Sequence, residues 1–138
     1  MVKILPCVTL DFNTFLGDTV LMKVVLACKN PFLSRSIGTV LAEVGIKQVI
    51  RTGKLERLET ELKSPGKVAL IDMEWEHIQR LSLLKKLINI ASICGNPVAC
   101  ICPNTEEDLK KLARAARATE VFIRYEIDNR FKDWLNNL

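Results

Sequence analysis

Five short apolar runs alternate with five amphipathic segments along residues 22–138, and this alternation constrains the fold more than any other feature. Because the runs are almost wholly apolar, the sheet that they form must be covered on both faces. Right-handed crossovers then favour a doubly wound α/β fold with five parallel strands in the flavodoxin-like order 2-1-3-4-5. The strands are predicted at 23–28, 46–50, 67–72, 98–102 and 120–124.

The segments between these runs carry apolar side chains spaced by three or four residues, which predicts helices with one buried face. Thr105 and Asp128 are predicted to cap the last two helices at their N-termini. The predicted buried stripes are Ile37, Val40, Leu41 and Val44; Leu55, Leu58 and Leu62; Leu81, Leu84, Ile88 and Ala91; Leu109, Leu112, Ala113 and Ala116; and Phe131, Trp134, Leu135 and Leu138.

The chain of 138 residues is expected to hold one domain, residues 22–138, preceded by an N-terminal extension, residues 1–21. No run of about 18 apolar residues exists, so no membrane-spanning helix is expected. Pro6 and Asp11 interrupt the apolar start, which argues against an export signal and for a cytoplasmic protein. The net charge of +4 is spread along the chain, so neither a membrane nor a nucleic acid is expected as a partner.

The chemistry-bearing residues are few. The chain has five cysteines, none in a CxxC pair, and one histidine, which predicts no zinc site and suits a reducing compartment. Cys100 and Cys102 lie two apart on a predicted strand and should share a face. There is no glycine-rich phosphate loop and no nucleophile elbow, and His77 has no recognisable triad partner. We expect no enzyme activity and no cofactor.

The apolar run at 67–72 ends on a single carboxylate, Asp72. In the predicted strand order the first and third strands flank the reversal point of the sheet, where the order of successive strands changes sides, and ligand sites of doubly wound sheets form there. The carboxyl ends of these strands carry Cys28 and Lys29 on one side and Asp72 on the other. We therefore expect any site at this edge.

Residues 22–138 resemble the receiver domain of bacterial two-component response regulators. The resemblance is carried by MKVVLACKNPFLSRSIGTVLAEVGI (22–46), GKVALIDMEW (66–75), NPVACICPN (96–104) and EVFIRY (120–125). It implies a domain that accepts a phosphoryl group on an Asp at the end of the third strand. A Mg²⁺ ion held partly by two acidic residues after the first strand assists that transfer.

At the residue level the resemblance places the phosphoacceptor on Asp72, which is retained. The acidic pair falls on Cys28 and Lys29, the hydroxyl position on Cys102 and the lysine position on Arg124. Neither Cys28 nor Lys29 is a hard oxygen donor, so tight Mg²⁺ binding is not expected. Lys29 and Arg124 are expected to keep Asp72 ionised in a metal-free cluster of ion pairs.

The resemblance therefore implies a degenerate receiver, or pseudo-receiver, that regulates by protein–protein interaction without Mg²⁺-dependent phosphorylation. The alternative is a phosphorylatable receiver that uses Asp72 with unusual ligands. A minor alternative is an anti-sigma-antagonist-like domain, which residues 67–104 also resemble. In that class a phosphorylatable Ser stands at the helix start, whereas the candidate Ser82 follows Leu81 and is expected inside the helix.

The last helix–strand–helix unit carries charges of both signs, which suits reciprocal ion pairs across a two-fold axis. Receivers commonly dimerise or bind targets there, which implies a homodimer through this surface or through residues 1–21 with the protein partner otherwise unknown. Trp75 could anchor a partner or cover the hydrophobic edge. The candidate interface residues are Trp75, Lys111, Arg114, Arg124, Tyr125 and Arg130.

Overall fold

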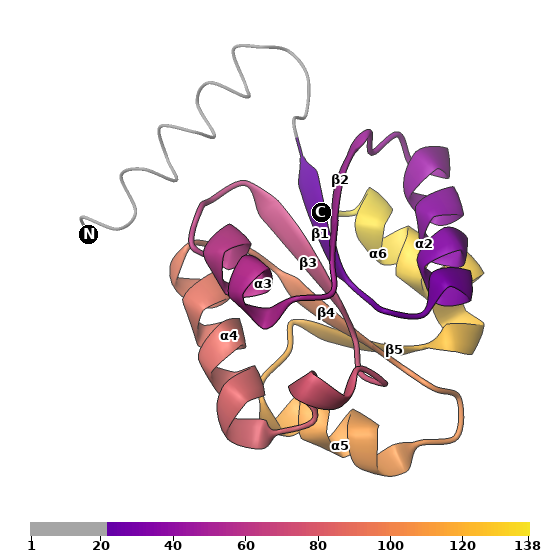
Figure 1. Ribbon diagram of the computed structural model, residues 1–138. Coiled ribbons are helices and arrows are strands. Elements are labelled where there is room, and N and C mark those ends of the chain that lie inside the picture. Colours follow the sequence, from indigo (N-terminus) through magenta and orange to yellow (C-terminus); the bar gives the residue numbers. More distant parts are fainter. Residues whose placement is uncertain (1–21) are drawn as a thin grey trace.

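Five parallel strands form one sheet in the order β2-β1-β3-β4-β5, as Figure 1 shows. The computed structural model of the chain describes residues 22–138, and the predicted extension, residues 1–21, lies outside the described residues. The strand order confirms the predicted flavodoxin-like α/β fold. The strands are β1 (Lys23–Ala27), β2 (Gln48–Thr52), β3 (Lys67–Asp72), β4 (Val98–Cys102) and β5 (Glu120–Ile123).

Helices cover both faces of the sheet. On one face lie α2 (Pro31–Glu43), α6 (Lys132–Asn136) and the short π-helical segment η3 (Ile127–Phe131), while α3 (Leu55–Leu62), α4 (Leu81–Ile93) and α5 (Glu107–Ala115) cover the other (Figure 1). Two 3₁₀ turns, η1 (Glu76–Ile78) and η2 (Arg124–Glu126), follow β3 and β5. Within residues 22–138, no helix has the length and apolar character needed to cross a membrane.

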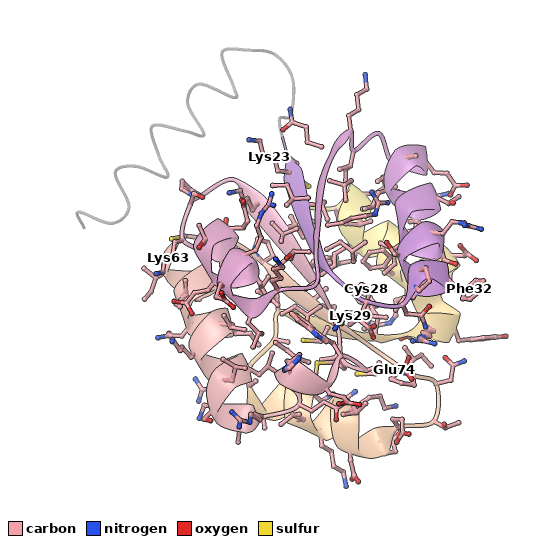
Figure 2. The ribbon with its side chains drawn as sticks, in the orientation of Figure 1. Lys23, Cys28, Lys29, Phe32, Lys63 and Glu74 are labelled. Carbon is pink, nitrogen blue, oxygen red and sulfur yellow. The ribbon has the colours of Figure 1, made fainter. Side chains whose placement is uncertain are left out.

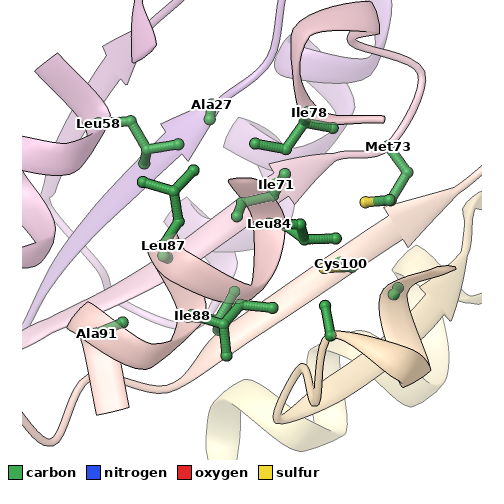
Figure 3. Packing of buried hydrophobic residues seen from close by; sticks show 14 of the residues in the cluster. Ala27, Leu58, Ile71, Met73, Ile78, Leu84, Leu87, Ile88, Ala91 and Cys100 are labelled. Carbon is green, nitrogen blue, oxygen red and sulfur yellow. The ribbon is translucent and has the colours of Figure 1, made fainter. Parts of the chain in front are cut away.

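Alternate strand residues divide the core into two layers. All of β3 is buried, with Val68 and Leu70 facing α2 and Ala69 and Ile71 facing α3 and α4. Figure 3 shows Ile71 beneath the α4 side chains that cover it. Cys100 and Cys102 are buried in this same layer, which confirms that they share a face. Each large apolar side chain buried in this way contributes roughly 1.5–3 kcal/mol.

The prediction for β2 was wrong by two residues, because the strand begins at Gln48 and ends at Thr52. Ile46 belongs to the termination of α2. Gly45 adopts a positive φ of 87°, and the N–H of Ile46 donates to the carbonyl of Leu41 at 2.9 Å. This hydrogen bond closes the end of the helix and delays the strand.

Neither predicted N-terminal cap is present. Thr105 lies in a turn after β4, and α5 begins at Glu107 without a side-chain cap. Asp128 lies inside the helical segment η3, because helical turns begin directly after β5 and run on into α6. The first turn of α5 instead contains Glu107 and Asp108, whose negative charges interact favourably with the positive, N-terminal end of the helix dipole.

Two predicted core residues lie at helix or chain ends and are exposed. Leu81 is the first residue of α4 and is 41% exposed, and Leu138 ends the chain and is also exposed. On α4 the buried face consists of Leu84, Leu87, Ile88 and Ala91, so Leu87 takes the place expected for Leu81. Ser82 is the second residue of α4 and is exposed, so it lies in the first turn and not in the helix interior.

Candidate functional site

The carboxyl ends of β1 and β3 meet at one edge of the sheet. The two strands are direct neighbours, with Ala27 paired to Ile71, so the residues that follow them lie side by side. Figure 2 shows Cys28 and Lys29 at this edge together with Glu74 from the loop after β3. The predicted site position at the reversal point of the sheet is therefore occupied by the side chains expected there.

Both carboxylate oxygens of Asp72 are bonded within the chain. Oδ1 accepts a hydrogen bond from the backbone N–H of Glu74 at 3.0 Å. Oδ2 lies 3.5 Å from the Cys28 sulfur, whose single thiol hydrogen is shared between this oxygen and the carbonyl of Asn30 at 3.4 Å. Asp72 is only 2% exposed. The thiol thus occupies the space beside Asp72 where the resemblance places an acidic residue.

The predicted ion-pair cluster around Asp72 was wrong. Burial raises the pKa of Asp72 above its usual value, and the Cys28 hydrogen bond and the charge of Arg124 oppose that rise only in part. Lys29 is exposed, and its side chain lies against Gly53, with Cγ 3.5 Å from the point where a Cβ at Gly53 would stand. Among residues 22–138, no cation forms an ion pair with Asp72.

Arg124 pairs instead with Glu74, whose carboxylate accepts from the guanidinium. Arg124 follows β5 and Glu74 follows β3, so the pair spans the end of β4, which lies between them. Sequence reasoning did not assign this partner. The signal was available: Glu74 lies two residues beyond the end of β3, at the same edge as Arg124, and carries the opposite charge.

The thiols of Cys28 and Cys102 are protonated at neutral pH. Burial and the nearby Asp72 carboxylate raise the pKa of Cys28 to about 11. Burial raises the pKa of Cys102 to about 11, against the opposing charges of Lys110 and Arg114. Since the thiolate is the nucleophile and the metal ligand, both side chains act as packing groups, and the Cys28 thiol also donates a hydrogen bond.

Trp75 covers the hydrophobic edge and was wrongly included among the candidate interface residues. Its side chain is 3% exposed and belongs to the core layer that contains Ile78 and Leu84. The ring of His77 contacts the indole edge-on at a centroid distance of 6.0 Å. The indole therefore closes the core beneath the loop after β3.

The other candidate interface residues divide into two groups. Arg124 and Arg130 are engaged within the chain, since Arg130 bonds Glu126 and lies over the Phe122 ring at 4.5 Å. Lys111 and Arg114 are exposed on α5, and Tyr125 is 78% exposed at the start of η2. These three side chains are available to a partner, and the homodimer stays a prediction.

The residues at this edge do not fit a Mg²⁺ ion. Mg²⁺ requires several oxygen ligands in near-octahedral geometry. The Asp72 carboxylate accepts from a thiol and an N–H, and the Glu74 carboxylate is paired with Arg124. Within residues 22–138, no group of three or more His, Cys, Asp or Glu side chains is arranged to hold a metal ion.

Comparison with known proteins shows a similarity of structure. No protein-family model matches the chain, and no curated protein matches its sequence. A pilus assembly-related protein from Burkholderia pseudomallei has a similar structure, with a TM-score of 0.60 over 82% of this chain and 88% of that chain. The likeness shows a shared fold. At 14% sequence identity the likeness shows nothing about function. Separately, the five-stranded parallel sheet fits a receiver-like domain.

The buried carboxyl of Asp72 leads to a prediction about stability. The folded chain holds the proton of Asp72 more tightly than the unfolded chain does, because burial raises the pKa of this carboxyl group. The stability that Asp72 contributes is therefore present at low pH and is lost as pH rises through the raised pKa. Asp72→Asn keeps an acceptor for the Glu74 N–H and removes the buried charge. We expect the midpoint temperature of thermal unfolding at pH 7 to rise by roughly 2–6 °C, which corresponds to about 1 kcal/mol in the free energy of unfolding. This gain should be absent near pH 4.

The control is Asp133→Asn, which neutralises an exposed carboxylate on α6. This variant is expected to change the midpoint by less than about 1 °C at either pH. A midpoint for Asp72→Asn that falls at pH 7 would show that the ionised carboxylate stabilises the fold.

Proposed function

We propose that this chain is an atypical receiver-like signalling domain that acts in the cytoplasm by binding proteins, without Mg²⁺-dependent phosphorylation and without enzyme activity of its own. One observation carries the proposal: both oxygens of Asp72 are engaged within the chain, and the neighbouring position holds the Cys28 thiol. A domain of this kind would present one fixed surface to its partner.

The requirements of phosphoryl transfer support this reading. An attacking carboxylate must be ionised, and cations must neutralise the charge on the transferred group. Burial raises the pKa of Asp72, which opposes the first requirement. The Arg124 guanidinium is paired with Glu74 and Lys29 lies against Gly53, which opposes the second.

The second candidate function is a phosphorylatable receiver that uses Asp72 with unusual ligands. It is favoured by the position of Asp72, which ends β3 at the reversal point of the sheet, as the resemblance requires of an acceptor. Opening the Arg124–Glu74 pair would free a cation close to the carboxylate.

Intact-mass measurement after incubation with acetyl phosphate and Mg²⁺ separates the two functions. We expect no added phosphoryl mass on the full chain, because Asp72 lacks a metal-ligating neighbour. The Asp72→Asn variant supplies the background of the measurement. Stoichiometric addition of one phosphoryl group, lost in Asp72→Asn, would establish the second function and overturn the proposal.

The structural relative is described as related to pilus assembly, and binding of this chain to partner proteins is part of our proposal. The available side chains Lys111, Arg114 and Tyr125 lie on the helix–strand–helix surface from which we predict homodimer formation. Both statements concern partner binding and are independent of the state of Asp72.

A further inference from the structure

A groove of about 570 Å³ runs between α4 and α5, and its lining contains none of the residues described at the Asp72 edge. It follows α4 from Ser82 in the first turn to Ser92 in the last. Its floor is apolar and consists of Ile88 and Ala116, both nearly buried. In Figure 1 the two helices that form it lie next to each other over the same face of the sheet.

The groove is cationic. Lys85, Lys86 and Arg117 line it, and no acidic side chain does. Lys86 makes only an exposed contact with Glu59, at 3.5 Å, and such contacts contribute little. Within residues 22–138, Lys85 and Arg117 form no ion pair. Two of the three cations are therefore available to an external anion.

The backbone at Arg117 is a second, independent observation. Its φ is 65°, and it is the one non-glycine residue of the described chain with a positive φ. Gly45 and Gly95 take this conformation after α2 and α4, where glycine adopts it without cost. An arginine in this conformation costs on the order of 1 kcal/mol. The end of α5 thus keeps a guanidinium where the backbone alone would favour glycine.

We propose that the α4–α5 groove binds an acidic segment of a partner protein. Aspartate or glutamate side chains of the segment pair with Lys85, Lys86 and Arg117, and its apolar side chains lie on the Ile88–Ala116 floor. The apolar floor and the absence of aromatic side chains from the lining favour a peptide over single-stranded nucleic acid, which stacks its bases on aromatic rings.

The proposal is tested by fluorescence anisotropy with a labelled synthetic peptide that alternates Glu with Leu. We expect binding that weakens with added salt and that is lost when Gln replaces Glu in the peptide. Arg117→Gly is the decisive variant. It should weaken binding about tenfold while raising the thermal midpoint, because it removes the cation and relieves the backbone.

Lys47→Glu serves as the control, since it reverses an exposed lysine outside the groove and should leave the affinity within about twofold. The proposal is overturned if the peptide does not bind, if Arg117→Gly binds it as tightly as the native chain, or if oligo-dT binds more tightly through the same residues. The measurement is repeated on Asp72→Asn, where unchanged binding is expected. Phosphorylation of Asp72 would overturn the proposed function without affecting this result.

Discussion

Replacing Asn96 with alanine is expected to lower the free energy of unfolding by about 3–5 kcal/mol. The carboxamide is 2% exposed and joins three segments of the chain. Its oxygen accepts from the N–H of Lys67 at 3.0 Å, and its nitrogen donates to the carbonyls of Leu62 at 3.1 Å and Ser64 at 2.9 Å. Alanine would leave all three backbone groups without that partner, at roughly 1–3 kcal/mol for each one that water does not reach.

Urea unfolding followed by circular dichroism measures this loss. Asn96→Asp is a near-isosteric comparison that can accept but cannot donate, and it should lose a similar amount at neutral pH. Asn136→Ala removes an exposed asparagine from α6 and should change stability by less than about 0.5 kcal/mol. A loss below about 1 kcal/mol for Asn96→Ala would show that water replaces the carboxamide.

The hydrogen bonds of Asn96 also illustrate which parts of the fold could be predicted from the sequence. β3 and β4 were predicted to the residue, because their apolar runs begin directly after Gly66 and Pro97 and are buried throughout. The boundary of β2 was missed because an apolar residue, Ile46, closes a helix through its backbone. The hydrophobic pattern of a sequence indicates which residues are buried. It does not indicate where a helix ends or how it is capped, because these depend on backbone hydrogen bonds.

The site divides in the same way. The strand order places Cys28 and Asp72 together, so their proximity followed from topology alone. The partners of Lys29 and Arg124 did not follow, because long side chains on neighbouring loops can reach several groups. Here the Arg124 guanidinium reaches Glu74 and the Lys29 stem lies along Gly53, which leaves Asp72 with a thiol and an N–H.

Cys28→Asp is expected to destabilise the chain by about 2–3 kcal/mol at pH 7 in the absence of divalent cations. The Cys28 sulfur lies 3.5 Å from a carboxylate oxygen of Asp72, so the new carboxylate would stand in contact with the old one. Two unit charges about 4 Å apart repel by about 4 kcal/mol at an effective dielectric constant near 20, and sharing one proton relieves part of this.

The pH dependence of Cys28→Asp has a definite sign. Mutual repulsion raises the pKa of the carboxylate pair in the folded state above the unfolded value. Stability is therefore retained at low pH and lost as pH rises through the raised pKa, so the deficit relative to the native chain should shrink towards pH 5. Cys28→Asn, which adds no charge, should show a deficit that varies little over this range.

Mg²⁺ should reverse the deficit in Cys28→Asp and leave the native chain unchanged. A cation that binds only the folded state stabilises it by about 2.7 kcal/mol at a hundredfold excess over its dissociation constant. Thermal unfolding with and without Mg²⁺ measures this, with Cys28→Asn as the uncharged control. An equal Mg²⁺ response in the native chain would mean that Asp72 binds the ion without a second carboxylate. The Cys28 thiol would then not explain why the proposed function is independent of Mg²⁺. A response confined to Cys28→Asp would show that a second carboxylate beside Asp72 suffices for Mg²⁺ binding at this edge, even though Glu74 remains paired with Arg124.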